Sequence, residues 1–202
     1  MSILRNRRLA FRSMGGGSLT SELAETFEAS EYDLAWTESG APDGDSTTQV
    51  KVGTKSLYLA AADDRIEIAI TDRDDYTFEG WFYLGATPGA TATAMGFRTS
   101  AGGARVLMRV NTSRQLAVYD AGDSAFTTDA LTLNTWYKVR MVWKDLGTCS
   151  MEFSTDGTFL GSGNKYTSKT GSTYTDIVRL RIGHTAGVTL SYWDDITLGY
   201  PA

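Results

Sequence analysis

Apolar and polar residues alternate with a period of two along short stretches of this chain. Residues 65–70 alternate strictly, and residues 104–110 place Val106, Met108 and Val110 on one side. This period is typical of β-strands with one buried face, and turn-forming residues separate the stretches. No stretch shows the 3.6-residue period of an amphipathic helix. The pattern predicts an all-β fold in which two antiparallel sheets form a sandwich or jelly roll.

Other stretches predict further parts of the sandwich. Residues 26–28 and 32–36 predict a first strand, and residues 136–143 with 149–153 predict a hairpin. The tryptophans at the two ends of 136–143 lie on opposite faces by parity, so only one of them belongs to the core. Residues 161–175 are polar and predict a loop.

The last predicted strand, residues 191–199, carries an acidic residue among apolar ones. Because strand side chains alternate, Asp194 shares a face with Ile196 and Leu198, and we expect it to enter the core at the start of the strand. A buried carboxylate has to be hydrogen-bonded, paired with a cation or bound to a metal ion. The fold must therefore place a hydrogen-bond donor, a cation or a metal ion next to Asp194.

Charge is distributed unevenly along the 202 residues, whose formal net charge is −5. Four arginines are the only charged residues before Glu22, so residues 1–20 carry +4 and the remainder carries −9. Three consecutive glycines follow these arginines and provide a flexible joint. We therefore expect a basic, extended N-terminal arm, residues 1–20, and one β-sandwich domain, residues 21–202.

The arm is predicted to dock on an acidic protein partner. The residues expected to make this contact are Arg5, Arg7, Arg8, Phe11 and Arg12. The alternatives are a disordered tail, an amphipathic membrane anchor and a nucleic-acid contact. The arm has no lysine run, no long helical stripe and one aromatic residue, so we predict neither a nucleic acid nor a membrane as partner.

Cysteine content and hydropathy bear on the compartment. Cys149 is the single cysteine, so it cannot form an intrachain disulfide, and we expect a small apolar strand residue. No apolar run is long enough to span a bilayer, and no secretory signal is recognisable. A chain without a leader that is built like an extracellular binding domain is typical of a virion component. We expect a virion location, with the extracellular space as the alternative.

Six short motifs follow one another between residues 53 and 196. They are GTKSLYL (53–59), YTFEGWF (76–82), NTWYKV (134–139), STDG (154–157), LRIG (180–183) and WDDI (193–196). In this order they resemble the concanavalin A-like lectin/glucanase superfamily, in its laminin-G-like and laminarinase-like branch. The resemblance implies a jelly roll of two curved antiparallel sheets with a concave face that often binds sugars.

The resemblance also implies a structural calcium ion on the convex side. Asp194 matches the family's aspartate of the last strand and Gly53 matches its glycine, while Glu28 lies near enough in motif order to contribute. Calcium favours such mixed sets of carboxylate and carbonyl oxygens. The alternative is that Asp194 only accepts backbone hydrogen bonds.

Catalytic members of this superfamily carry a Glu-x-Asp-x-x-Glu strand motif, which this chain lacks. Retaining glycoside cleavage needs two carboxyl groups close together on one face. The single histidine, His184, is expected to form local hydrogen bonds, with a role as the base of a lyase as the minor alternative. Neither a Gly-x-Ser-x-Gly elbow nor a phosphate-binding loop occurs. We predict a protein without catalytic activity.

Two functions are consistent with these features. The first is a structural virion protein of a tailed phage, a capsid decoration, head-fibre or tail component that docks on other virion proteins through its arm and displays a lectin-like sandwich. The second is a free carbohydrate-binding module that recognises cell-surface glycans, and further copies of the chain are possible partners through strand edges. The sugar platform assigned by strand parity is Trp81, Tyr83, Arg105, Arg109 and Tyr119. These rings would otherwise fill the core or brace a loop.

Overall fold

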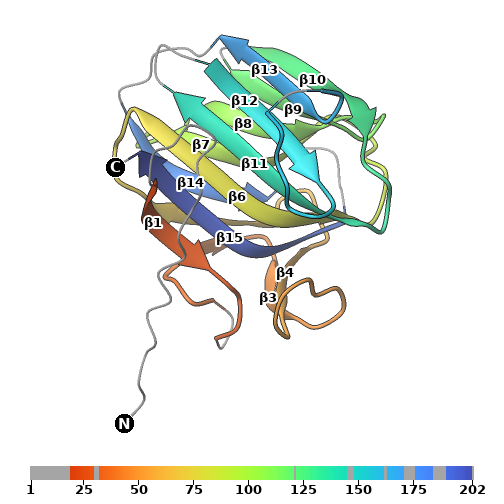
Figure 1. Ribbon diagram of the computed structural model, residues 1–202. Helices are drawn as coiled ribbons and strands as arrows, with labels where there is room; N and C mark the ends of the chain where they lie inside the picture. The colour runs from red at the N-terminus through yellow and green to blue at the C-terminus, as the bar shows by residue number, and fades with distance from the viewer. Residues whose placement is uncertain are drawn as a thin grey trace.

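Two antiparallel sheets pack face to face in this protein (Figure 1). The structure, a computed structural model, describes residues 19–29, 32–120, 122–144, 148–161, 163–170, 176–183 and 190–201. All regular structure in these ranges is β-strand, which confirms the predicted all-β sandwich. None of the described residues belongs to a helix of the length and hydropathy needed to cross a membrane.

The eight-stranded sheet lies in front in Figure 1. Its strand order is β13 (Tyr166–Thr170), β12 (Thr148–Ser154), β11 (Trp136–Lys144), β6 (Asp75–Leu84), β15 (Ser191–Pro201), β4 (Ser56–Leu59) and β3 (Asp43–Ser46), with β1 (Leu19–Glu25) also paired to β15. On one side of β15, β4 pairs with residues 191–193 and β1 pairs with residues 196–201. The partner strand on this side therefore changes at Asp194 and Asp195.

The seven-stranded sheet forms the second layer, behind the first in Figure 1. Its strand order is β10 (Asp123–Ala130), β9 (Gln115–Asp120), β8 (Ala104–Val110), β7 (Ala92–Thr99), β14 (Ile177–Gly183), β5 (Arg65–Ala69) and β2 (Thr37–Ser39). The long central strands of both sheets mostly present alternate residues to the space between the layers, as expected for antiparallel sheets with one face buried.

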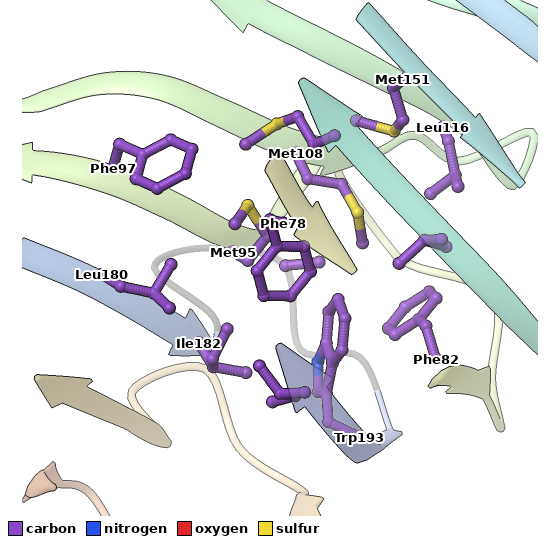
Figure 2. Close-up of a cluster of buried hydrophobic side chains, with 14 of the residues drawn as sticks. Phe78, Phe82, Met95, Phe97, Met108, Leu116, Met151, Leu180, Ile182 and Trp193 are labelled. Carbon is purple, nitrogen blue, oxygen red and sulfur yellow. The ribbon is translucent and has the colours of Figure 1, made fainter. Parts of the chain in front are cut away.

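The hydrophobic core fills this space between the sheets. Trp193 of β15 packs against Phe78 and Phe82 of β6, with ring centroids 5.7 Å and 4.8 Å apart. Figure 2 shows side chains of both sheets converging on this cluster, among them Met95, Phe97, Met108, Leu180 and Ile182 from the seven-stranded sheet. Each fully buried large side chain stabilises the fold by about 1.5–3 kcal/mol, so the core holds the two sheets together.

Several predictions about individual strands are confirmed. β11 and β12 form the predicted hairpin, with Val139 opposite Phe153. Trp143 is fully buried, whereas Trp136 is partly exposed on the outer face. Cys149 is buried in the core, and this burial raises the pKa of its thiol to about 12, so the residue is chemically quiet at neutral pH.

The prediction of a loop over residues 161–175 is wrong in part, because residues 166–170 form β13. This strand pairs with β12 at the edge of the eight-stranded sheet. Only Thr167 among its five residues is buried. An edge strand with so little buried surface has no need of apolar residues, so its hydropathy pattern resembles that of a loop.

The predicted first strand is also wrong, because residues 26–29 and 32–36, which lie between β1 and β2, are not in a strand. Phe27 has a left-handed backbone, with φ of 59°, and the carboxylate of Glu25 organises the loop. Glu25 is fully buried and accepts hydrogen bonds of 2.7–3.0 Å from the backbone NH groups of Phe27, Asp33 and Leu34 and from the indole of Trp36. β1 begins at Leu19, two residues before the predicted domain boundary.

The prediction that Asp194 shares the core-facing side of β15 with Ile196 and Leu198 is wrong. A β-bulge interrupts the pairing of β15 with β6 between Asp194 and Thr197, and Asp195 has φ of 47°. One extra residue in a strand reverses the alternation. Trp193 is therefore the core-facing residue, and Asp194 lies on the outer face opposite Trp81.

Candidate functional site

The five residues predicted to form a sugar platform are divided between the two outer faces of the sandwich. Trp81 and Tyr83 belong to β6 of the eight-stranded sheet. Arg105 and Arg109 belong to β8, and Tyr119 belongs to β9, both in the seven-stranded sheet. All five point away from the core, because they alternate with fully buried core residues. The structure thus brings together the last three but separates them from the first two.

Four aromatic residues form a row across adjacent strands of the eight-stranded sheet. They are Tyr58, Tyr192, Tyr83 and Trp136, which are direct register partners on β4, β15, β6 and β11 and are called the aromatic row below. Neighbouring ring centroids are 4.9, 5.5 and 5.3 Å apart along the row. Tyr192 and Tyr83 are only 5% and 6% exposed, so the rings pack mainly on one another.

Trp81 lies two residues before Tyr83 on the same face of β6, and two lysines lie close to its ring. The ammonium of Lys51 is 4.3 Å from a ring centroid and that of Lys138 is 5.7 Å away. Lys138 is also 3.5 Å from a carboxylate oxygen of Asp195. A ring that already binds cations offers less free surface for a sugar. Trp81 and Tyr83 are therefore packing residues in this structure.

The outer face of the seven-stranded sheet is rich in arginine. On its five central strands the outward side chains include Arg65, Glu67, Arg98, Arg105, Arg109, Arg179 and Arg181, which together with Leu107 and Tyr119 are called the arginine face below. Their outward direction follows from the buried residues that alternate with them, such as Ile66, Phe97 and Leu180. Glu67 is the one acidic residue among these outward positions of the described central strands.

Glu67 of β5 binds two arginines of the neighbouring strand β14. One carboxylate oxygen is 2.9 Å from a terminal nitrogen of Arg179, and the other is 2.9 Å from Nε and 2.8 Å from a terminal nitrogen of Arg181. Arg98 approaches to 3.9 Å and also donates to the carbonyl of Gly102. Burial alone raises the pKa of Glu67, but the hydrogen bonds from both arginines outweigh it, so this pKa lies below its ordinary value.

The centre of the arginine face is a register row that joins Tyr119, Leu107, Gly96, Arg181 and Glu67 across five strands. Leu107 is 3% exposed although it points outward, and a Cβ atom on Gly96 would lie 2.3 Å from its Cδ2 atom. Only glycine lets this leucine lie flat across the neighbouring strand. The apolar side chain of Leu107, called the Leu107 strip below, therefore lies between two groups of charged residues. On one side are Glu67, Arg179 and Arg181, called the Glu67 cluster below, and on the other are the arginines of β8.

Arg109 lies on the other side of this strip. Its guanidinium carbon is 3.6 Å from the ring centroid of Tyr119, a stacked cation–π geometry. Within the part of the chain that the structure describes, Arg109 forms no ion pair. Stacking thus fixes the plane of a guanidinium whose charge no carboxylate of the described residues neutralises.

The residues predicted to bind calcium lie near one loop. Asp194 is 1% exposed, and its Oδ2 atom accepts hydrogen bonds from the backbone NH groups of Lys51 and Val52 at 2.9 and 2.8 Å. Its Oδ1 atom is buried and accepts no hydrogen bond from the described residues. Burial raises the pKa of Asp194 to about 6. This free oxygen fits one ligand position of a calcium ion.

Glu28 and Gly53 contribute differently. The Glu28 carboxylate accepts hydrogen bonds from the backbone NH groups of Thr54 and Lys55 and from the Thr54 hydroxyl, at 2.8–3.1 Å. Gly53 has φ of 72°, and a Cβ atom there would lie 2.2 Å from Glu28 Oε1. The described residues contain no group of three or more acidic, histidine or cysteine side chains placed to hold a metal. Any calcium at Asp194 would rely largely on backbone carbonyls and water.

Two sets of predicted residues lie outside the described residues. They are the arm residues Arg5, Arg7, Arg8, Phe11 and Arg12, and His184. Four further residues of the arginine face were not predicted from the sequence, namely Glu67, Arg98, Arg179 and Arg181. The patterns Arg65-x-Glu67 and Arg179-x-Arg181 were visible in the alternation, but their pairing depends on which strands are neighbours.

The sequence matches the Laminin_G_3 family of the concanavalin A-like lectin/glucanases superfamily over residues 42–194. Because this match covers more than half of the chain, the protein belongs to that family. It therefore has a lectin-like β-sandwich, which is the class that the two sheets define. No curated protein matches the sequence.

Solved structures with the same fold differ widely in activity. The binding domain of botulinum neurotoxin serotype D matches 90% of this chain with a TM-score of 0.63 and 9% identity. An endo-β-1,4-glucuronan lyase from the fungus Trichoderma reesei matches 90% of the chain and 96% of its own length, with a TM-score of 0.57 and 12% identity. A Trypanosoma rangeli sialidase matches 74% of the chain with a TM-score of 0.56 and 19% identity.

The chain spans 48% of the length of the neurotoxin binding domain and 26% of that of the sialidase. At these identities the likeness shows the fold alone. Both enzymes and a binding domain occur among these structures, so the fold leaves the activity open.

Proposed function

We propose that this protein is a non-catalytic glycan-binding module whose binding site is the arginine face. The observation that carries the proposal is the arrangement around Leu107, where an apolar strip lies between two groups of fixed guanidinium donors. Sugars present both apolar CH faces and hydroxyl groups, so such a combination suits them. The aromatic row is a weaker candidate, because its rings are covered by one another.

The chemistry of Glu67 supports a role without catalysis. Glycoside hydrolysis generally requires two carboxyl groups, one of which acts as an acid. On the central strands that the structure describes, Glu67 is the one outward carboxylate, and arginines bind both of its oxygens. A carboxylate held in this way is a poor proton donor at neutral pH, because its pKa is lowered.

The proposal is tested by measuring binding and turnover together. The purified full chain is applied to a panel of neutral and acidic polysaccharides, and retention is measured by affinity electrophoresis. Each retained polysaccharide is then incubated with the protein and assayed for new reducing ends and for the unsaturated sugars that a lyase produces. Retention without either product supports the proposal. A product would show an enzyme, and no retention on any glycan would refute glycan binding.

A role in a virion is a second proposal, supported by the charge contrast between residues 1–20, at +4, and the rest of the chain, at −9. In this proposal the arm docks on an acidic surface of other virion proteins, and the sandwich projects from the particle. Co-sedimentation of the full chain with undecorated particles, compared with a chain lacking residues 1–20, tests it. Equal co-sedimentation of the two proteins would contradict docking through the arm, and no co-sedimentation of either would favour a free extracellular module.

A further inference from the structure

We infer that the ligand of the arginine face is an acidic glycan, a polymer whose sugars carry carboxylate groups. This inference rests on the proposed glycan-binding function and specifies its ligand class. On the described central strands six arginines and one glutamate point outward, although the chain as a whole is acidic with a net charge of −5. A cluster of one sign against the overall charge raises the local concentration of oppositely charged ligands.

The Glu67 cluster is already arranged for a further carboxylate. Glu67 occupies some of the donors of Arg179 and Arg181, but each guanidinium has five NH groups. The side chain of Arg179 is 44% exposed, so part of its guanidinium group faces solvent. Glu67 therefore orients the two arginines without neutralising them, because one negative charge cannot balance both of its close partners.

Arg109 provides a second binding point on the other side of the Leu107 strip. Its stacking on Tyr119 fixes its plane, and no carboxylate among the described residues pairs with it. A planar guanidinium binds a carboxylate through two parallel hydrogen bonds, which a lysine cannot reproduce. β8 and β14 are separated by β7 and so lie about 10 Å apart, and Arg109 is two residues further along β8 than Leu107, which is level with Arg181 of β14. This spacing suits charges repeated along a polymer.

The same features argue against a nucleic acid. Binding of single strands generally uses open aromatic faces on which bases stack. On the arginine face the ring of Tyr119 already carries the guanidinium of Arg109, and the neighbouring outward residues are Leu107 and Ala117.

The experiment compares polygalacturonate with the same polymer after its carboxyl groups have been reduced to alcohols. Affinities are measured by calorimetry for the full chain, with single-stranded RNA as a third probe. Two variants are compared: Arg109→Gln with Arg179→Gln, and a control, Lys144→Gln with Lys165→Gln. The control removes the same charge from exposed positions on or near the eight-stranded sheet. Thermal melts establish whether each variant is folded. If the arginine double variant does not fold, the single variant Arg109→Gln replaces it in the binding measurements.

We expect polygalacturonate to bind and the reduced polymer to bind at least tenfold more weakly, since each lost charge-assisted contact costs about tenfold. The arginine double variant should lose about tenfold or more, the lysine control should bind normally, and Arg109→Lys should bind with intermediate affinity. Equal binding of the two polymers would overturn the acidic ligand while leaving glycan binding intact. Binding to neither polymer nor any other glycan would overturn both proposals. Preference for RNA, or equal losses in both double variants, would also overturn the inference.

Discussion

The two outer faces of this sandwich use aromatic and charged residues in opposite ways. In the aromatic row each ring has a neighbouring ring as partner, and the central rings of Tyr83 and Tyr192 are almost completely buried. On the arginine face three arginines share Glu67, Arg65 pairs with Asp63, and Arg109 has no carboxylate partner among the described residues. The comparison teaches that residue type alone does not mark a binding face. What matters is whether the fold has already provided each side chain with a partner.

The largest expected effect concerns the aromatic row. Tyr192→Ala removes a buried ring that contacts both Tyr58 and Tyr83, and we expect the free energy of unfolding to fall by about 3 kcal/mol with glycan affinity unchanged. Urea unfolding and calorimetry measure the two quantities. Tyr58→Ala, at the partly exposed end of the row, serves as the matched control with a smaller loss. Lost glycan binding in folded Tyr192→Ala would move the binding site to this face.

The proposed calcium ion at Asp194 is the next test, because this residue lies on the same face as the aromatic row. If calcium occupies the free Oδ1 atom, a chelator should lower the Tm by about 5–10 °C, the equivalent of a ligand at about 100 times its Kd. In Asp194→Ala the chelator should have no effect. Identical melts of the natural chain with and without chelator would leave Asp194 as a hydrogen-bond acceptor only.

Glu67→Gln tests the other face. Removing the carboxylate leaves clustered arginines without their counter-charge, and we expect the free energy of unfolding at pH 7 to fall by about 2 kcal/mol. Since the folded-state pKa of Glu67 lies below its ordinary 4.5, its stabilisation is fully present above pH 4.5 and is lost as the pH falls through the folded value. The difference from the natural chain should therefore shrink in acid.

Urea titrations at pH 7 and at about pH 3 measure this dependence. Glu38→Gln, at an exposed position on β2, is the control and should unfold like the natural chain at both pH values. A constant difference between Glu67→Gln and the natural chain at the two pH values would show that the ion pairs contribute nothing to stability.

The smallest expected effect on stability belongs to Arg109→Gln. This change removes one cation–π contact at a partly exposed site, so the free energy of unfolding should change by no more than about 0.5 kcal/mol. The same variant should bind polygalacturonate about tenfold more weakly. A large loss of stability would show that Arg109 is a structural residue like those of the aromatic row, and the contrast between the two faces would disappear.

Much of the fold was predictable because strands with one buried face carry a period-two pattern. The hairpin of β11 and β12, and the burial of only one of its two tryptophans, follow directly from that pattern. β13 was missed because an edge strand buries little, and the loop after β1 was taken for a strand because apolar residues such as Phe27 are buried in it. Local hydropathy does not distinguish these cases.

The candidate site was predictable only as separate residues. Parity placed Trp81 with Tyr83 on one side of β6 and Arg109 with Arg105 on one side of β8, but it did not show that β6 and β8 belong to different sheets. The hydrogen bonds of Glu67 join residues 112 and 114 positions apart in the chain, and no local pattern reports such a pairing.

By itself, the sequence determined the all-β class, the inward and outward residues of most strands, and the separation of charge between arm and body. These properties depend on neighbours within a few residues. The tertiary structure alone decided that Asp194 lies outside the core, because a single bulge residue reverses the alternation of β15. It also decided which rings are covered and which arginines gather around Glu67, because strand order in a sheet results from long-range packing.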